Sequence, residues 1–181
     1  MRSGFTLWFT GLSGAGKTTI AELVAPELER RGLAVEWLDG DVVRTHLTKG
    51  LGFSKDDRDT NIERIGWVAS RLTRHGAAVI VSAISPYEAT RRKARALVEE
   101  FGTFVEVHVA TPVEECERRD AKGLYERARA GEIAEFTGVS DPYEEPKSPE
   151  LRLDTTEHEP EESARLVIAK LEELGLLGVA A

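Results

Sequence analysis

Short apolar runs alternate along this chain with longer segments in which apolar residues recur at helical spacing. Several of the short runs are almost entirely apolar, which is typical of strands that helices cover on both faces of a parallel sheet. The runs that predict strands are Phe5–Phe9, Ala34–Leu38, Ala77–Ala83, Phe104–Val109 and, more weakly, Leu151–Leu153. Their alternation with helical segments predicts repeated β–α units around one mainly parallel, five-stranded sheet.

The longer segments predict helices, and several of their ends carry recognisable signals. Gly32 and Gly76 follow the first two helices, where glycine commonly ends a helix. Pro112 and Pro160 stand at the start of two others, where proline sacrifices no hydrogen bond. The predicted helices are Thr18–Arg31, Asp59–Arg74, Tyr87–Phe101, Pro112–Arg119 and Pro160–Leu174. Together the elements predict a single α/β domain over residues 1–181.

The segment of residues 120–149 departs from this pattern. It mixes three glycines and three prolines with many charged residues, and it is basic at its start. An ordinary surface excursion is one interpretation. The other is a mobile lid that closes over phosphates and excludes water, and this is the interpretation that we favour.

Composition limits the classes of function. Hydrophobic residues make up 41% of the chain and charged residues 31%, as in a globular protein. A net charge of −8 opposes general binding to nucleic acid or to an acidic membrane, so we expect neither partner. Cys116 is the only cysteine, which excludes an internal disulfide. Because neither a secretory signal nor a membrane span is visible, we expect a cytoplasmic protein.

One motif carries most of the functional information. The run Gly11-Leu12-Ser13-Gly14-Ala15-Gly16-Lys17-Thr18 is a complete G-x-x-x-x-G-K-[ST] loop between a predicted strand and a predicted helix. Its glycines allow backbone N–H groups to surround phosphate oxygens. Lys17 can then reach the β- and γ-phosphates, and the Thr18 hydroxyl can join the Mg²⁺ shell. The loop predicts a protein that binds a nucleoside triphosphate.

Two carboxylates indicate which class of phosphate-loop protein this is. The chain lacks the Asn-Lys-x-Asp of a regulatory GTPase, and no predicted strand ends in the Asp-Glu of a mechanical ATPase. Instead Asp39-Gly40-Asp41 follows the second predicted strand, where carboxylates can lie beside the phosphate and face a substrate hydroxyl. The alternative for Asp41 is the N-cap of a short helix over Val42–Leu47. The pair favours a small-molecule kinase.

Short motifs between Leu7 and Pro149 extend this interpretation. They include Leu38–Arg44, Leu51-Gly52-Phe53-Ser54, Lys122-Gly123-Leu124-Tyr125, Phe136-Thr137-Gly138 and Asp141-Pro142-Tyr143-Glu144. On these residues the chain resembles the adenylylsulfate kinase (APS kinase) family. The resemblance implies a three-layer α/β/α P-loop kinase fold with a lid segment. It also implies transfer of the ATP γ-phosphate to the 3′-hydroxyl of adenosine 5′-phosphosulfate, a step of sulfate assimilation.

The resemblance also implies the roles of individual residues. ATP would lie on the phosphate loop, that is Gly11, Leu12, Ser13, Gly14, Ala15, Gly16, Lys17, Thr18 and Thr19, with Arg129 added by the lid. Thr18 and Asp39 would lie at the Mg²⁺. The acceptor would contact Asp41, Arg44, Phe53, Arg58, Asn61, Ile84, Ser85, Lys122, Leu124 and Phe136. Within that set Asp41 would serve as base or orienting group, and Phe53 and Phe136 would sandwich the adenine.

Ser85 has two interpretations. It matches a serine that forms a phosphorylated intermediate in some family members, so it is a candidate catalytic residue beside Lys17 and Asp41. In-line transfer needs no covalent step, however, and no histidine or aspartate adjoins Ser85 in sequence. The alternative is a hydroxyl that caps the helix beginning near Pro86.

The remaining expectations concern partners and departures from the family. The resemblance implies a homodimer. The chain begins almost at its first predicted strand, so we expect no N-terminal extension, and a relation to a fusion with ATP sulfurylase stays open. Val42 stands where the family often has asparagine. Two alternatives to an APS kinase are another small-molecule or nucleotide kinase and a catalytically silent nucleotide-sensing domain, although silence would not require an intact Lys17, Thr18 and Asp41.

Overall fold

The computed structural model describes residues 4–120 and 122–177, and its centre is a parallel sheet. The strands are β1 (Phe5–Thr10), β2 (Val35–Asp39), β3 (Ala78–Ser82), β4 (Thr103–Val109) and β5 (Leu151–Leu153). They run in the order β2-β3-β1-β4-β5, and each neighbouring pair is parallel. The predicted mainly parallel, five-stranded sheet is confirmed.

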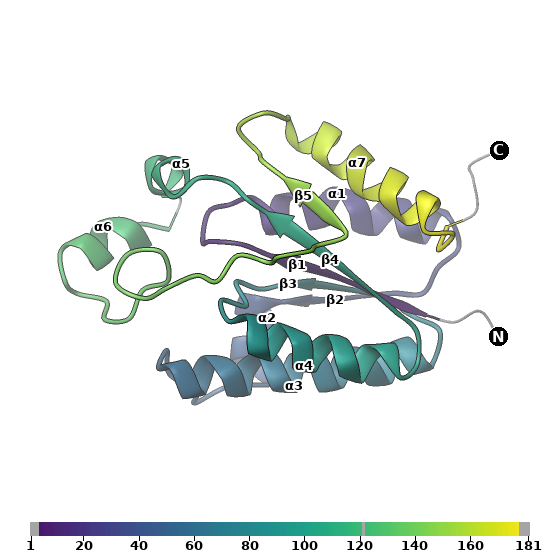
Figure 1. Cartoon of the computed structure of the whole chain (residues 1–181), viewed down its shortest axis with the longest axis horizontal. Coiled ribbons are helices and arrows are strands. Elements are labelled where there is room, and N and C mark those ends of the chain that lie inside the picture. The colour runs from purple at the N-terminus through teal and green to yellow at the C-terminus, as the bar shows by residue number, and fades with distance from the viewer. Residues whose placement is uncertain (1–3, 121, 178–181) are drawn as a thin grey trace.

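Helices cover both faces of the sheet (Figure 1). They are α1 (Lys17–Arg30), α2 (Gly40–His46), α3 (Lys55–Arg74), α4 (Glu88–Glu99), α5 (Val113–Arg119), α6 (Leu124–Arg129) and α7 (Pro160–Glu173). The α1 and α7 helices pack together on one face, and α3 and α4 pack together on the other. This is the three-layer α/β/α arrangement. None of the described helices is long and apolar enough to cross a membrane.

Each face of the sheet has its own core. Leu7 and Phe9 of β1 point toward α1 and α7, whereas Trp8 points toward α3 and α4 and stacks on Phe104 at 5.4 Å. Successive side chains of a strand point to opposite faces, so a central strand covered on both sides is apolar throughout. The near-continuous apolar runs of the sequence arise from this double burial.

Two helices differ from the sequence prediction. The α3 helix begins at Lys55 rather than Asp59, because the Ser54 hydroxyl accepts a hydrogen bond from the backbone N–H of Asp57 and caps it. The α6 helix lies inside the segment predicted only as a lid, and its short length of six residues left no periodic signal. This segment lies beyond the carboxyl ends of the strands (Figure 1).

Candidate active site

The phosphate loop joins the end of β1 to the start of α1. Gly11, Gly14 and Gly16 have φ angles of +151°, +75° and +107°, a region that other residues rarely adopt. A Cβ on Gly11 would lie 2.4 Å from the carbonyl oxygen of Val109. The loop therefore needs its glycines, and it presents backbone N–H groups and a helix N-terminus where an anion can bind.

Lys17 folds back onto this loop. Its ammonium group donates hydrogen bonds to the carbonyl oxygens of Gly11, at 2.8 Å, and Leu12, at 2.7 Å. The residue is buried, and the loss of solvation lowers the pKa of its ammonium group from 10.5 to about 8. Lys17 thus holds contacts for which the oxygens of a bound phosphate would compete.

Asp39 connects the phosphate loop to the neighbouring strands. Its Oδ2 accepts hydrogen bonds from the Thr18 hydroxyl at 3.2 Å and from the Ser82 hydroxyl at 2.9 Å. Its Oδ1 accepts one from the backbone N–H of Asp41 at 3.0 Å, so Asp39 caps α2. The structure therefore brings Thr18 and Asp39 together, and their hydroxyl and carboxylate oxygens are ligands that suit Mg²⁺ beside phosphate oxygens.

Asp41 lies in the first turn of α2, with its side chain 75% exposed. The alternative that Asp41 caps this helix is wrong, because Asp39 occupies the cap position. The Asp41 carboxylate instead forms an ion pair with the ammonium group of Lys122, which comes from the lid segment 81 positions later. The expected base and the expected lid cation therefore meet in this structure.

Phe53 lies in the loop before α3 and is 59% exposed. The guanidinium carbon of Arg44 lies 4.4 Å from the centroid of its ring. Arg44 also donates a hydrogen bond to the carbonyl oxygen of Gly52 at 3.0 Å. An exposed ring beside a cation is a surface on which a planar base can stack, and nothing in the core requires this phenylalanine.

Arg58 and Asn61 project from α3 and are buried. Arg58 donates hydrogen bonds to the Asp141 carboxylate at 2.7 Å and to the Thr137 hydroxyl. The Tyr87 hydroxyl donates to the same Asp141 oxygen at 2.6 Å. In this structure Arg58 therefore fastens α3 to the later part of the lid segment.

The buried side chain of Asn61 makes its hydrogen bond to a different segment. Its amide oxygen accepts a hydrogen bond from the Thr48 hydroxyl at 2.7 Å, so it also ties α3 to the loop after α2. The sequence analysis assigned no role to Asp141, Tyr87 or Thr48. The motif around Asp141 was visible, but its contacts with α3 depend on the tertiary fold.

Ile84 and Ser85 form a loop after β3 that touches the phosphate loop. The Ile84 carbonyl oxygen accepts hydrogen bonds from the Thr10 hydroxyl at 2.6 Å and the Gly11 N–H at 3.3 Å. Ser85 is 1% exposed, and its hydroxyl accepts a hydrogen bond from Trp8 Nε1 at 3.1 Å. The α4 helix starts after Tyr87 without a side-chain cap, so the alternative that Ser85 caps it is wrong.

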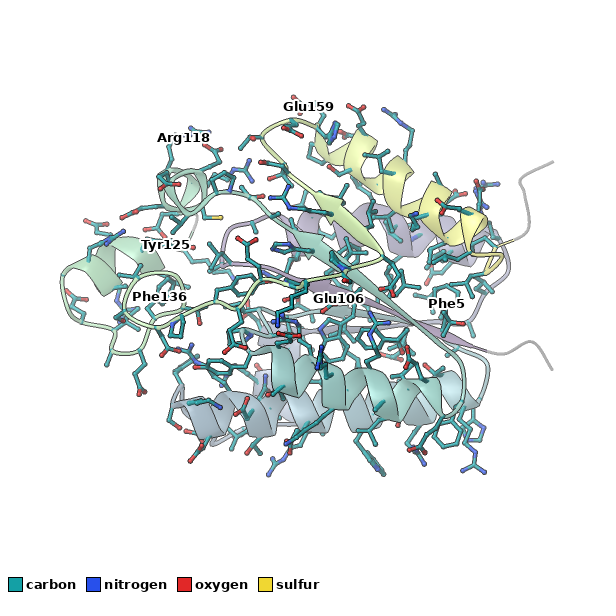
Figure 2. The ribbon with its side chains drawn as sticks, viewed as in Figure 1. Phe5, Glu106, Arg118, Tyr125, Phe136 and Glu159 are labelled. Carbon is teal, nitrogen blue, oxygen red and sulfur yellow. The ribbon has the colours of Figure 1, made fainter. Side chains whose placement is uncertain are left out.

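The lid segment is attached to the phosphate loop. Tyr125 of α6 donates a hydrogen bond to the carbonyl oxygen of Ser13 at 2.9 Å, and Phe136 packs edge-to-face on Tyr125 at 5.0 Å (Figure 2). Phe136 is only 8% exposed, so in this structure its ring packs in the core rather than lying open to an adenine. Leu124 packs against the same core. Aromatic residues in this segment have no helical or alternating pattern, which is why their burial was missed.

Arg129, expected to reach the donor phosphates, pairs with Glu117 of α5 at 2.9 Å. Both side chains are partly exposed, so this pair contributes little to stability. A contact between Arg129 and ATP would require the side chain to change partner.

The sequence analysis missed a cavity of about 620 Å³ beside the phosphate loop. Its lining includes Gly16, Thr19, Arg119, Thr155 and Pro160. Arg119 donates hydrogen bonds to the hydroxyl of Thr155 at 2.8 Å and to its carbonyl oxygen at 3.1 Å, which joins α5 to the loop before α7. In Figure 2, the label Arg118 marks α5 and the label Glu159 marks the loop before α7. Only the fold brings these distant segments together, so sequence spacing offered no signal.

The model of the adenylylsulphate kinase family matches residues 3–154. The chain belongs to the adenylylsulphate kinase family. It is 59% identical to the adenylyl-sulfate kinase of Picosynechococcus sp. over 96% of this chain and 97% of that protein. A Mycobacterium tuberculosis APS kinase CysC, solved in complex with AMPPNP and APS, has a TM-score of 0.91 and 46% identity, covering 95% of this chain and 99% of that one.

The family also includes fused forms. This chain is 56% identical to the probable bifunctional SAT/APS kinase 2 of Sorangium cellulosum over 96% of its own length but only 29% of that protein.

Proposed function

We propose that this chain transfers the γ-phosphate of ATP to the 3′-hydroxyl of adenosine 5′-phosphosulfate. Membership of the family supports the reaction, and one observation carries its assignment to these residues. Asp39 ends β2 beside the phosphate loop, Asp41 follows two residues later, and Lys122 of the lid segment pairs with Asp41. A phosphate donor on the loop and a hydroxyl near Asp41 would thus lie within one site.

The donor half is the phosphate loop together with the cavity beside it. ATP phosphates would replace the loop carbonyls as partners of Lys17. The 620 Å³ cavity continues from Gly16 and Thr19 and is large enough for the nucleoside of ATP. Thr18 and Asp39 would hold Mg²⁺, which neutralises phosphate charge when bound.

The acceptor half would be built from α2, the loop before α3 and the lid segment. Asp41 would accept or orient the proton of the 3′-hydroxyl while the new O–P bond forms and the bond to the ADP leaving group breaks. Phe53 would stack on the adenine, and Arg44, Arg58 and Asn61 would hold the phosphosulfate. Phe136 would reach the base only if its ring left the contact with Tyr125.

We propose direct transfer, without a phosphorylated Ser85. The Ser85 hydroxyl is buried and bonded to Trp8, so it is badly placed to attack a phosphate on the loop. Ile84 and Ser85 would instead shape the wall of the acceptor site through their backbone.

A coupled assay of ADP release tests the proposed function. The chain would be supplied with ATP, Mg²⁺ and one acceptor at a time: adenosine 5′-phosphosulfate, AMP, another nucleoside monophosphate or gluconate. We expect turnover with the phosphosulfate to exceed turnover with every other acceptor. Turnover with another acceptor, and none with the phosphosulfate, would identify a different kinase; binding without any turnover would indicate a nucleotide sensor.

The family resemblance also supports a homodimer acting in the cytoplasm, where ATP is available. Light scattering on a sizing column would report a mass of twice the chain mass. An association with ATP sulfurylase is a further proposal, and the fused relative supports it.

A further inference from the structure

We propose that Arg91 of α4 is a positioning residue for the acceptor half of the site. Its single guanidinium group holds the loop of residues 83–87 and the later part of the lid segment, at Glu144, in one arrangement. The inference rests on the proposed function for its kinetic test, but the contacts that support it belong to the structure alone.

The loop that Arg91 holds has an unfavourable backbone conformation. Ser85 has a φ of +50°, a left-handed value that costs free energy for a residue with a Cβ. Such a conformation persists only where surrounding contacts determine it. Thr10 and Trp8 supply two of these contacts, through the Ile84 carbonyl and the Ser85 hydroxyl.

Arg91 supplies a third contact, and this one also joins the loop to a distant part of the chain, at Glu144. It is 3% exposed, and its Nη1 donates a hydrogen bond to the Ser85 carbonyl oxygen at 2.7 Å. Its Nη2 donates to the Glu144 carbonyl oxygen at 2.6 Å, and its Nε donates to the Glu106 carboxylate at 3.0 Å. Because a guanidinium group is planar and rigid, it sets the distance between the two carbonyl groups.

The Glu144 contact matters because of what precedes it in the chain. The backbone N–H of Glu144 donates to the Pro86 carbonyl oxygen at 2.8 Å, and the Tyr143 hydroxyl lies 2.9 Å from the Thr10 hydroxyl. Asp141, which holds Arg58 and Tyr87, lies just before them. Arg91 therefore controls the end of the segment that orients Arg58, and it does so without facing the acceptor site itself.

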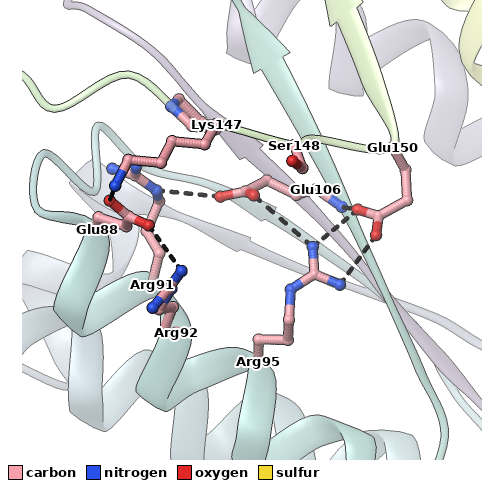
Figure 3. A pocket seen from close by; sticks show the side chains of 9 residues that line it. Glu88, Arg91, Arg92, Arg95, Glu106, Lys147, Ser148 and Glu150 are labelled. Carbon is pink, nitrogen blue, oxygen red and sulfur yellow. Dashed lines mark hydrogen bonds and ion pairs between the residues drawn. The ribbon is translucent and has the colours of Figure 1, made fainter.

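Figure 3 shows Arg91 within a cluster of charges around a cavity of about 240 Å³. Arg95, one turn further along α4, donates to the Glu150 carboxylate at 2.9 and 2.8 Å. Arg95 also pairs with Glu99, lies 3.7 Å from the Glu106 carboxylate and donates to the Phe104 carbonyl oxygen, and it makes no hydrogen bond to the loop of residues 83–87. Arg95 is 24% exposed, against 3% for Arg91, but it belongs to the same charge cluster and lacks the contact with Ser85, so it serves as the control.

The experiment compares Arg91→Lys, Arg91→Gln and Arg95→Gln in the full chain. Lysine keeps the charge opposite Glu106 and so favours folding, but one ammonium group cannot replace the planar pair of donors. We expect both Arg91 variants to raise the KM for adenosine 5′-phosphosulfate about tenfold or more while the KM for ATP stays within about twofold. Arg95→Gln should lower the melting temperature without this split.

A second readout does not depend on turnover. The chain has three tryptophans, so the indole N–H signal of Trp8 can be assigned in an NMR spectrum by replacing Trp37 and Trp67 with phenylalanine. Because Trp8 donates to Ser85, Arg91→Lys should shift this signal and Arg95→Gln should not.

Two results would overturn the proposal. One is an acceptor KM for Arg91→Lys within twofold of wild type with an unmoved Trp8 signal. The other is a rise in acceptor KM for Arg95→Gln that equals the rise for the Arg91 variants. That result would show that any disruption of the charge cluster around Arg91 and Arg95 has the same effect. Absence of turnover in the wild-type chain would instead count against the proposed function, and the Trp8 signal would still test the role of Arg91.

Discussion

The ionisation of Lys17 couples donor binding to pH. Burial lowers its pKa to about 8, so the free enzyme loses this cation as the pH rises through that value. We expect kcat/KM for ATP to fall above about pH 8, whereas kcat should persist to higher pH because bound phosphates favour the ammonium form. Steady-state rates from about pH 6.5 to 9.5 would test this. A profile that stays flat for kcat/KM of ATP, or falls equally for the acceptor at saturating ATP, would contradict it.

A substitution of Asp41 tests the proposed phosphoryl transfer most directly, because this residue would accept or orient the proton of the attacking hydroxyl. Asp41→Asn keeps the shape but removes charge and basicity, so kcat should fall by about 10²- to 10⁴-fold while acceptor binding changes only a few fold. The matched control is Asp56→Asn, which alters another exposed carboxylate in the first turn of a helix. An unchanged kcat for Asp41→Asn would contradict the catalytic role of Asp41 and reduce its function to the ion pair with Lys122.

The two candidate aromatic residues should respond differently to truncation. Phe53 is exposed, so Phe53→Ala should raise the acceptor KM by the loss of stacking, worth about 1–3 kcal/mol, at nearly constant melting temperature. Phe136 is buried against Tyr125, so Phe136→Ala should cost about 3–5 kcal/mol of stability. Kinetics and thermal unfolding of both variants, with Phe136→Leu as the volume-conserving control, separate these effects. A large loss of stability for Phe53→Ala would place that side chain in the core.

At the scale of elements, the lid segment is fixed at Tyr125 and at Phe136, and most of the chain between these two residues is exposed. Tyr125 and Phe136 are buried, whereas residues 129–132 are exposed, as are residues 134 and 135. A glutamate-specific protease should therefore cut first at Glu132 or Glu135 rather than at Glu144, whose backbone bonds to Pro86 and Arg91. ADP with adenosine 5′-phosphosulfate should slow that first cut if closure orders the segment. Mass spectrometry of early fragments would show the order, and first cleavage at Glu144 would contradict it.

The elements also show what sequence periodicity can reveal. The strands were predicted to within a residue or so at most ends, because double burial gives long apolar runs. The buried side chains of the lid segment were missed because a six-residue helix and the loops beside it carry no period. For the site, the contiguous phosphate loop and Asp39-Gly40-Asp41 were visible in sequence. The cavity beside Thr155 and the contacts of Arg91 were not, since each joins segments far apart in the chain.

At the scale of the whole molecule, the buried His108 makes the free energy of unfolding depend on pH in the acid range. His108 of β4 is 3% exposed, and burial lowers the pKa of its imidazole from 6.5 to about 4. The unfolded chain therefore binds more protons than the folded one between these values, and stability is lost as the pH falls through this window. The loss should reach up to about 3 kcal/mol.

Denaturant unfolding at several pH values checks this expectation. The control is His108→Phe, which keeps a ring beside Tyr143 but cannot titrate. The free energy of unfolding of the wild type should fall relative to that of the variant as the pH falls from about 6.5 to 4, since only the wild type loses stability through this residue. A constant difference would show that His108 has the same pKa in the folded and unfolded states, which would contradict this expectation.

The position of β1 has a consequence for synthesis of the chain. This strand is made first, yet in the sheet it lies at the centre, between β3, which begins at Ala78, and β4, which begins at Thr103. All neighbouring strands are parallel, so the five described strands form no hairpin that could fold locally. Such distant pairings fold slowly because loop closure precedes any gain from contact. A nascent chain therefore carries Leu7, Trp8 and Phe9 uncovered until β4 has left the ribosome, and the strand that bears the phosphate loop is a strand for chaperones to protect.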